Sequence, residues 1–465
     1  MENKEKLPFS RMLGYSLGTN IRVVENIFAF YFVYYLTTVA GVDPGIAGII
    51  SSCVVLWAAC ISPIIGHFAD RPGRKRKLVL ITTVPISVLL FLLFSTFNFG
   101  ATGNVVYFVI VGCLCYSIYY MFLIPYDSLG AELSEGYNTR TTMRGLCTAF
   151  VYISGIVGGT LTLFLQGKFV ESGMSLVNSW HVAVLASCAL ILIAGISSYI
   201  STRSVDKKGE ASSEVLEKPQ NIFKSYKEML KLKPFVALVL FCLIYFIGTT
   251  ILATDIVYYG IYSLGLSEAA ASLFFTVATV ATLIAIAPAT ALINKLGKKR
   301  VLIMSLWILI IIALVVFVKG PTSYLDGWAI MIGYSLTNAT VLIAIFSMLY
   351  DVSELAEFVT GRQKVGAAVG ALTFGMGIAQ SIAYALFGFI LKTGGYDAMA
   401  MEQTGKAIDT ITLTATVIPA ALVFVSMITL VLYKINKKNY EALLSALNAK
   451  REGKEYSTEG FKELL

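Results

Sequence analysis

Charged residues are scarce in this 465-residue chain: Asp, Glu, Lys and Arg make up only 14% of it, and hydrophobic residues make up 57%. A soluble globular domain carries roughly 25% charged residues. A helix that crosses a bilayer needs about 20 predominantly apolar residues, and twelve such stretches with their loops would fill nearly the whole length. The composition therefore excludes a mostly soluble protein and leaves no room for a separate soluble domain.

Residues that commonly hold metals or form cross-links are also few. The seven cysteines lie in apolar stretches without the paired spacing of a zinc or disulfide framework. The two histidines, His67 and His181, are far apart and have no HExxH-like context. A GxxxxGK[ST] phosphate loop is absent, and MENKEKLPFSR at the N-terminus lacks the apolar core of a signal peptide. We therefore expect no metal site, no cofactor, no ATP-driven pumping and no enzyme activity.

Apolar runs predict twelve membrane-spanning helices in two groups of six. The first group lies near residues 12–40, 44–67, 77–97, 104–128, 144–167 and 179–201, and the second near 234–262, 269–294, 300–319, 326–350, 364–391 and 408–434. These runs predict an N-terminal six-helix bundle (1–201), a cytoplasmic linker (202–233), a C-terminal six-helix bundle (234–434) and a cytoplasmic tail (435–465). The tail, rich in Lys, Glu and Leu, is expected to be a solvated or surface-lying helix.

The net charge of +8 is distributed unevenly along the chain. Of the 36 Lys and Arg residues, one lies within a span (Arg22) and four lie on odd-numbered loops (Lys168, Lys319, Lys392 and Lys406); the others lie at the N-terminus, on even-numbered loops and in the tail. Positively charged loops stay in the cytoplasm. We therefore expect both termini inside an inner or plasma membrane, and no nucleic-acid partner.

Two loop sequences recur in the second half of the chain. ADRPGRKRKL after the second span matches INKLGKKRVL after the eighth, with an offset of 224 residues from Asp70 to Asn294. AELSEGYNTR after the fourth span matches SELAEFVTGR after the tenth, with an offset of 222 residues from Glu132 to Glu354. Such a duplication of a six-helix unit predicts a substrate cavity between the halves near the bilayer midplane, with access alternating as one half rocks against the other.

Several segments resemble known carriers. GHFADRPGRKRK (66–77) resembles the loop signature of the major facilitator superfamily (MFS) and falls in the matching loop. Four further segments, YSLGTN (15–20), IPYDSLGAELSEGYNTR (124–140), YDVSELAEFVTGRQ (350–363) and FILKTGGY (389–396), resemble the glycoside-pentoside-hexuronide:cation symporters, the melibiose-carrier group. The resemblance implies an all-α MFS fold of two pseudo-symmetric six-helix bundles. It also implies symport of a small organic solute, with a glycoside or glucuronide as the first expectation.

The sequence departs from the melibiose carriers where those proteins bind sodium. Their second span carries two carboxylates in a W-D-x-x-x-D-P pattern, whereas this chain has Trp57 and Ala58, then Ser62 and Pro63. A desolvated Na⁺ needs oxygen ligands and usually a negative charge. We therefore expect H⁺ more than Na⁺ as the coupling cation.

The sugar-contacting positions of the family have changed as well. In the same register, its acidic positions in the first and fourth spans become Val23 and Leu123, an arginine position becomes Thr148, and a lysine position becomes Met376. Three alternatives therefore stay open: a carrier of a steroid-like, aromatic or amphipathic acid; an uncoupled facilitator; and, from another class, a non-transporting membrane sensor.

Four ionisable residues stand out within the predicted spans, where each costs roughly 2.5 to 3.5 kcal/mol on insertion scales. Arg22 and Glu25 are three residues apart and can share a helix face, either as a self-neutralising pair or as a substrate or proton site. Asp127 follows Pro125 in the fourth span. Asp255 has no basic neighbour on its own helix and is the best candidate for a proton or substrate-amine site, with Glu25 as its partner in proton coupling.

Uncharged side chains supply further candidates for the substrate site. Aromatic faces can stack on a sugar or another flat ring, although helix packing and interfacial belts also explain them. These substrate candidates are Asn26, Trp57, Tyr120, Tyr126, Tyr258 and Asn338, together with Thr148 and Met376.

Charged residues at the predicted cytoplasmic side recur at fixed register in the two halves. Charge that only sets the orientation of the protein in the membrane explains the Lys and Arg residues but not the repeated carboxylates. The family resemblance implies that these residues form a charge network that closes the cytoplasmic side of the transporter. The predicted cytoplasmic gate comprises Asp70, Arg71, Gly73, Arg74, Glu132, Arg140, Asp351, Glu354 and Arg362. We expect a monomer in the lipid bilayer.

Overall fold

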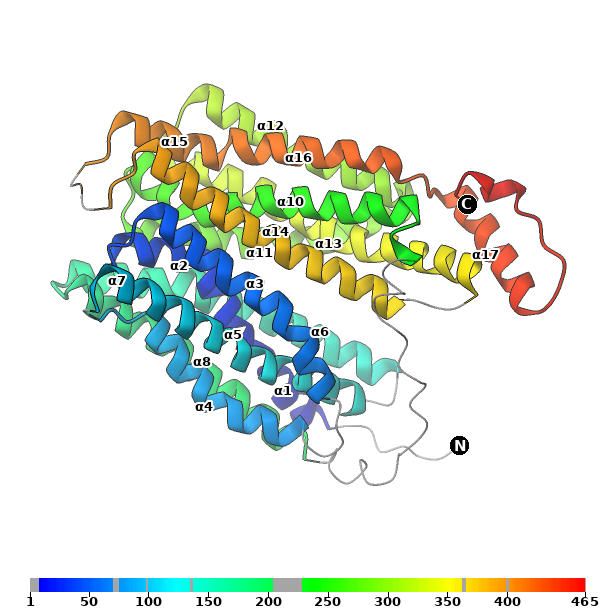
Figure 1. Cartoon of the computed structure of the whole chain (residues 1–465), viewed down its shortest axis with the longest axis horizontal. Coiled ribbons are helices and arrows are strands. Elements are labelled where there is room, and N and C mark those ends of the chain that lie inside the picture. The colour runs from blue at the N-terminus through cyan, green and yellow to red at the C-terminus, as the bar shows by residue number, and fades with distance from the viewer. Residues whose placement is uncertain are drawn as a thin grey trace. The chain divides into compact units, whose positions relative to one another are not determined.

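A computed structural model describes residues 8–69, 75–97, 99–133, 137–203, 228–361, 365–398, 400 and 402–464. Within these ranges the regular secondary structure is entirely helical (Figure 1). In lipid no water is available to bond backbone N–H and C=O groups, and a helix satisfies nearly all of them internally. The helical content therefore follows directly from the long apolar runs.

The helices follow one another along the chain with short connections. Up to the central stretch they are α1 (Phe9–Leu17), η1 (Gly18–Arg22), α2 (Val23–Thr38), α3 (Pro44–Ala69), α4 (Lys75–Leu93), α5 (Gly100–Leu133), α6 (Tyr137–Gly155), η2 (Ile156–Leu161), α7 (Thr162–Glu171) and α8 (Leu176–Ser201). After it they are α10 (Lys233–Tyr258), η3 (Tyr259–Ser263), α11 (Glu268–Leu296), α12 (Lys298–Lys319), α13 (Tyr324–Thr360), α14 (Val365–Gly394), α15 (Gly405–Ala415), α16 (Val417–Thr429), η4 (Leu430–Leu432), α17 (Lys437–Arg451) and η5 (Glu459–Leu464).

Eleven helical segments of the described chain are long and apolar enough to cross a membrane. The first predicted span is present as well, but it is broken into α1, the 3₁₀ turn η1 and α2, of 9, 5 and 16 residues. Two further spans contain a π-helical turn, η2 in the fifth and η3 in the seventh. Such irregular turns frequently mark functional positions in helices.

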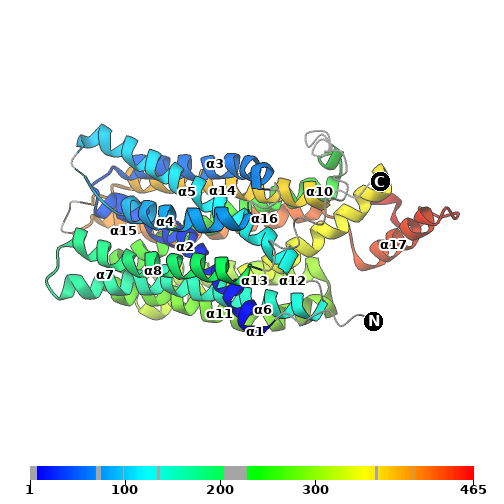
Figure 2. The same ribbon diagram turned by 90° about the horizontal axis from the view of Figure 1, so that it is seen from below.

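The chain forms two compact units, each of which takes residues from both halves of the sequence. Unit 1 contains Met1–Val215, Ala253–Thr279 and Tyr384–Ile411, and unit 2 contains Leu216–Leu252, Val280–Ala383 and Thr412–Leu465. In unit 1, α4 packs against α5 and α8, and α7 packs against α8 (Figure 2). In unit 2, α12 packs against α13 and α16. The domain boundaries predicted from the sequence stay a prediction.

The C-terminal tail forms a helix, as its composition predicts, and one side of that helix packs against protein. Its helix α17 packs against α13, and Leu443 and Leu447 are buried. Asn436 and Asn439 form a reciprocal capping box at the start of α17, which satisfies backbone N–H groups that have no partner within the helix. The apolar stripe of the tail thus faces protein rather than water or a membrane surface.

Candidate substrate and gating sites

Two of the family-like segments, YSLGTN and IPYDSLG, meet in unit 1 through a pair of tyrosines. The rings of Tyr15 and Tyr126 stack with centroids 4.6 Å apart. The Tyr15 hydroxyl donates to the Tyr126 carbonyl oxygen at 2.9 Å, and the Tyr126 hydroxyl donates to the Tyr15 carbonyl oxygen at 2.8 Å. Because the Tyr126 proton is used in this way, the Thr19 hydroxyl, 2.8 Å from it, is the donor in their shared bond. The sequence motifs showed the resemblance but not this reciprocal contact.

The tyrosine pair depends on two glycines of the same segments. A Cβ atom on Gly130 would lie 2.1 Å from the Tyr15 hydroxyl oxygen, and one on Gly18 would lie 2.4 Å from the Tyr126 ring. Neither helix could approach the other as closely with a larger residue at these positions. The pair therefore fixes the broken first span against α5.

A cavity of about 120 Å³ opens beside this tyrosine pair. Four predicted candidates, Arg22, Tyr126, Asp127 and Thr148, share its wall. The full lining consists of Tyr15, Thr19, Arg22, Tyr126, Asp127, Gly130, Met143, Cys147, Thr148 and Val151. Its residues come from the broken first span, α5 and α6. Sequence reasoning missed Tyr15, Thr19 and Cys147, although YSLGTN already pointed to the first two.

Arg22 lies between two carboxylates in this region. Its guanidinium is 3.4 Å from a Glu25 carboxylate oxygen and 3.6 Å from an Asp127 carboxylate oxygen. The side chains of Arg22, Glu25 and Asp127 remain 31%, 35% and 46% exposed. The i,i+3 pairing of Arg22 and Glu25 agrees with the sequence prediction, while the contact with Asp127 joins α5 to the first span. These three residues, named here the charged triad, combine one cation with two anions.

The other predicted substrate residues occupy varied places. Asn26 donates to the Ser154 hydroxyl at 3.3 Å, and Tyr120 is half-buried beside Tyr119. Trp57 does not line the cavity: it is 45% exposed and donates to the Ser117 hydroxyl at 2.8 Å. Asn338 and Met376 are half-buried residues of unit 2.

Polar side chains from the two halves of the sequence meet elsewhere in unit 1. The Tyr34 hydroxyl donates to a Glu268 carboxylate oxygen at 2.7 Å. Thr37 and Tyr258 share a hydrogen bond of 2.8 Å between their hydroxyls, and so do Thr160 and Thr276. We call these six residues the half-to-half contact: Tyr34, Thr37, Thr160, Tyr258, Glu268 and Thr276.

Ring contacts and irregular turns reinforce the half-to-half contact. Phe30 and Phe275 have ring centroids 4.3 Å apart, and Tyr258 packs against Tyr396 with centroids 5.4 Å apart. The π turn η2 contains Thr160, and its Gly159 carbonyl oxygen accepts a hydrogen bond from Tyr31. The residues of the half-to-half contact follow no sequence periodicity that would have predicted it. For the π turn η2, only the two adjacent glycines of IVGGTL indicate an irregular helix.

Asp255 lies one helical turn before Tyr258 on α10 and is fully buried. Its segment of α10 belongs to unit 1, the unit that also holds α2 and the half-to-half contact. The sequence prediction placed Asp255 in mid-span, and the structure places it eight residues before the end of the candidate span at Ser263. Asp255 stays a candidate for carrying a proton, as the sequence predicts.

Two glycines bring α3 and α14 together near the same contact. A Cβ on Gly388 would lie 2.3 Å from the Pro44 carbonyl oxygen and 2.8 Å from the Gly48 Cα atom. Backbone atoms cannot rotate away, and overpacking costs about 1–3 kcal/mol. We expect Gly388→Ala to weaken the half-to-half contact and to raise the rate at which maleimide labels a Thr160→Cys reporter in purified protein by at least about fivefold.

Gly375→Ala is the matched control for this prediction. A Cβ at Gly375, on the same helix, would meet only a leucine side-chain atom at 4.0 Å, which is an ordinary contact. The two variants should therefore differ in labelling rate. Equal rates would show that the glycine contact does not hold the two helices together.

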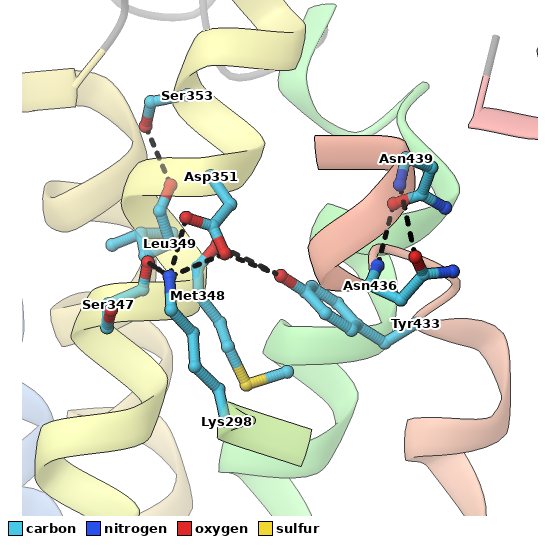
Figure 3. Close-up of polar contacts among 9 residues, drawn as sticks. All are labelled: Lys298, Ser347, Met348, Leu349, Asp351, Ser353, Tyr433, Asn436 and Asn439. Atoms are coloured by element: carbon cyan, nitrogen blue, oxygen red, sulfur yellow. Dashed lines mark hydrogen bonds and ion pairs between the residues drawn. The ribbon is translucent and has the colours of Figure 1, made fainter. Parts of the chain in front are cut away.

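The predicted cytoplasmic gate is described only in part. Asp70, Arg71, Gly73, Arg74 and Arg362 lie outside the described residues, as do the side chains of Glu132 and Arg140. In unit 2, the Lys298 ammonium donates to both carboxylate oxygens of Asp351 at 2.7 Å and to the Ser347 carbonyl oxygen at 3.2 Å (Figure 3). Glu354 lies one turn further along α13. The ion pair between Lys298 and Asp351 thus joins the repeated INKLGKKRVL loop to the YDVSELAE segment within the second half.

Comparison with known proteins gives the family. Residues 15–437 match the family described as MFS/sugar transport protein. The chain belongs to this family. This agrees with the resemblance seen in the sequence, and the all-α fold of about twelve spans is confirmed.

The chain is similar to symporters over nearly its full length. Uncharacterized symporter YjmB of Bacillus subtilis is 25% identical to this chain, and the match covers 97% of each protein. The sodium-dependent lysophosphatidylcholine symporter 1 of Xenopus tropicalis is 20% identical over 99% of this chain and 94% of its own length. The putative glycoside/cation symporter YagG of Escherichia coli is 21% identical over 94% of each chain. A crystal structure of nucleoside transporter NupG shares the fold, with a TM-score of 0.63 and 13% identity over 92% of this chain and 99% of that one.

These findings establish the class of activity. The chain is a secondary transporter and a multi-pass membrane protein. Its relatives named symporters imply a small-molecule substrate and a coupling cation.

Proposed function

We propose that the protein is a proton-coupled symporter of a neutral glycoside or sugar and that the cavity beside Tyr15 and Tyr126 is part of its substrate site. The observation that carries this proposal is the charged triad at a cavity lined by Thr19, Tyr126 and Thr148. Carboxylates accept and guanidinium groups donate strong hydrogen bonds, so together they suit the many hydroxyls of a sugar. An aromatic face suits the apolar face of a sugar ring.

The charge of the triad supports a neutral solute. When both carboxylates are ionised, Arg22, Glu25 and Asp127 together carry one excess negative charge. That excess repels an anionic glucuronide and provides a place for a proton. Ser62 stands where the melibiose carriers have a carboxylate, and its hydroxyl donates to the Ala59 carbonyl oxygen of its own helix at 3.3 Å, which supports H⁺ over Na⁺.

We further propose that the half-to-half contact is an outer gate. Its residues lie toward the loops after the first, fifth and seventh predicted spans, which the distribution of Lys and Arg assigns to the outside. Alternating access requires such a contact to form and break in each cycle. In the same scheme both termini are cytoplasmic, and the predicted cytoplasmic gate, which includes Asp351 and Glu354, forms an inner gate.

A thermal-shift screen of purified protein tests the solute class, because binding to the folded state raises the melting temperature. The panel should include neutral glycosides, glucuronides, steroids and lysophosphatidylcholine. We expect stabilisation by a neutral glycoside. Stabilisation by lysophosphatidylcholine, with none by any glycoside, would overturn the sugar assignment.

Asp127→Asn tests whether the ligand uses this cavity. A hydrogen bond to a charged group contributes about 1.5–3 kcal/mol, so the Kd of the stabilising glycoside should rise roughly tenfold or more. Glu171→Gln is the control, because Glu171 pairs only with Lys168 at an exposed position. An unchanged Kd in Asp127→Asn would place the substrate elsewhere.

A further inference from the structure

Three hydroxyl groups of the cavity wall in unit 1 already donate their protons to protein atoms. The Tyr15 hydroxyl donates to the Tyr126 carbonyl oxygen, and the Tyr126 hydroxyl donates to the Tyr15 carbonyl oxygen. The Thr19 hydroxyl donates to the Tyr126 hydroxyl oxygen, because that oxygen has no second proton to give. We call the bonds that run from Thr19 through Tyr126 to the Tyr15 carbonyl oxygen the hydroxyl relay.

The thiol group on the same wall is used in the same way. The Cys147 thiol donates to the Ser16 hydroxyl oxygen, 3.5 Å from its sulfur, and the Ser16 hydroxyl donates to the Met143 carbonyl oxygen at 3.4 Å. Ser16 is fully buried. Like the hydroxyl relay, this second chain of bonds leads the protons away from the cavity and ends on a backbone carbonyl oxygen.

Acceptor sites remain on this wall after the protons have been used. A hydroxyl oxygen has two lone pairs, and donating its proton leaves both of them available. Thr19 therefore keeps its acceptor sites, and an ionised Asp127 carboxylate can only accept. The cation of the wall, Arg22, lies 3.4 Å from the Glu25 carboxylate and 3.6 Å from the Asp127 carboxylate. A ligand in this cavity thus meets mainly oxygen atoms that accept hydrogen bonds.

The surroundings of the hydroxyl relay keep its direction fixed. Thr19 and Tyr126 are buried, and the ring of Tyr126 is stacked on that of Tyr15. To reverse the relay, Tyr126 would have to give up its bond to the Tyr15 carbonyl oxygen inside this buried pair, which is unfavourable. Binding of a ligand that only accepts hydrogen bonds would require this reversal at Thr19.

We propose that the cavity selects its ligand through hydroxyl groups that the ligand itself donates, because the hydroxyl relay leaves Thr19 and Asp127 as acceptors. The ligand class is a sugar ring with free hydroxyl groups, and an analogue that can only accept at the same positions is rejected. This inference rests on the proposed function and names the chemistry of the same cavity. Tyr126 acts in this selection as a positioning residue, since it sets the direction of the Thr19 proton.

Deoxy and deoxyfluoro sugars separate donation by the ligand from acceptance. Fluorine is small and accepts a hydrogen bond weakly, but it cannot donate one. The probes are methyl glucoside, methyl galactoside and methyl xyloside, each compared with derivatives in which one ring hydroxyl is replaced by hydrogen or by fluorine. We expect that wherever hydrogen raises the Kd roughly tenfold or more, fluorine raises it equally in calorimetry of the purified full-length protein. Fluorine derivatives that bind like the parent at those positions would overturn the proposal.

Two Tyr→Phe substitutions on the stacked pair form a matched test of the hydroxyl relay. Tyr126→Phe keeps the ring but removes the oxygen that accepts the Thr19 proton, so this proton becomes available to a ligand. At one ring position the fluorine derivative should then bind about two- to fivefold more tightly than the hydrogen derivative. Tyr15→Phe is the control, because it removes a hydroxyl from the same pair and leaves the relay in place. If the two variants treat the derivatives alike, the relay does not set the selectivity and the proposal is wrong.

Thr19→Val gives a second test that does not depend on how Tyr126→Phe folds. Valine has nearly the shape of threonine but offers no lone pair. In this variant the roughly tenfold penalty for replacing one particular ring hydroxyl should nearly disappear, because its partner is already absent. A penalty that stays unchanged at every ring position would show that Thr19 accepts no bond from the ligand.

Asp127→Asn distinguishes a failure of this inference from a failure of the proposed function. If Asp127→Asn leaves the Kd unchanged, or if none of the parent methyl glycosides binds, the proposed substrate site fails and this inference fails with it. If Asp127→Asn weakens binding while the fluorine derivatives bind like their parents, the cavity remains the substrate site and only the selection for donated hydroxyl groups is wrong.

Discussion

Cross-linking Thr160→Cys to Thr276→Cys is expected to stop transport, and reduction of the disulfide is expected to restore it. The two hydroxyl oxygens lie 2.8 Å apart, so cysteines at these positions are placed to approach disulfide distance with little movement. Thr160 belongs to the first half and Thr276 to the second. If access alternates by separating the halves at this contact, a covalent bond across it traps one state.

The experiment uses a background in which the seven native cysteines are replaced by serine and transport has been verified. Oxidised protein is reconstituted into liposomes, and solute uptake is compared with the cross-linked fraction measured by mass spectrometry. Uptake should fall in proportion to that fraction. The matched control is Gln166→Cys with Ser179→Cys, whose parent side chains lie 3.5 Å apart on α7 and α8 of the first half. Complete cross-linking of 160 to 276 with normal uptake would contradict the outer gate.

Asp255→Asn is expected to abolish uptake driven by a pH gradient while leaving solute exchange in place. Asparagine has almost the same shape as aspartate but cannot take up or release a proton in this range. Intramembrane carboxylates commonly serve as proton relays, and loss of one should reduce gradient-driven accumulation on the order of tenfold or more. Counterflow, in which labelled and unlabelled solute exchange without net proton movement, requires only that the gates still work.

Asp409→Asn is the control for this prediction, because it removes the same charge from an exposed position on α15. Both variants should be tested in sodium-free liposomes and again with a sodium gradient. Uptake that follows sodium in the wild-type protein would overturn the proton assignment. Normal pH-driven uptake by Asp255→Asn would show that another group carries the proton.

The sequence predicted the helical architecture because hydropathy reports directly on the length of apolar runs. It also predicted the pairing of Arg22 with Glu25, since residues three apart share a helix face. The contact of Arg22 with Asp127 could not be predicted in the same way. It depends on how α5 packs against the broken first span, and no local pattern records that arrangement.

Contacts over long sequence separations account for most of what the sequence left open. Arg451 and Glu357 form an ion pair across 94 residues of sequence, and each looks like an ordinary charged residue of a polar segment. Thr160 and Thr276 look like ordinary small residues of an apolar span. The tail was expected to be a solvated or surface-lying helix, but its composition did not show that Leu443 and Leu447 would be buried in contact with protein. Pairings of this kind become visible only when the helices are placed in three dimensions.

The direct backbone contact at Gly48 and Gly388 has a consequence for the energy of switching. Small residues let helices approach closely without interlocking side chains. When such a seam separates, little apolar area becomes newly exposed, so the hydrophobic cost is small at about 25 cal/mol per Å². The glycine seam therefore adds little to the free-energy gap between the two conformers, which depends instead on the polar bonds and ring contacts of the half-to-half contact. A ligand that prefers one conformer by about 5.5 kcal/mol can move such an equilibrium from 1:99 to 99:1.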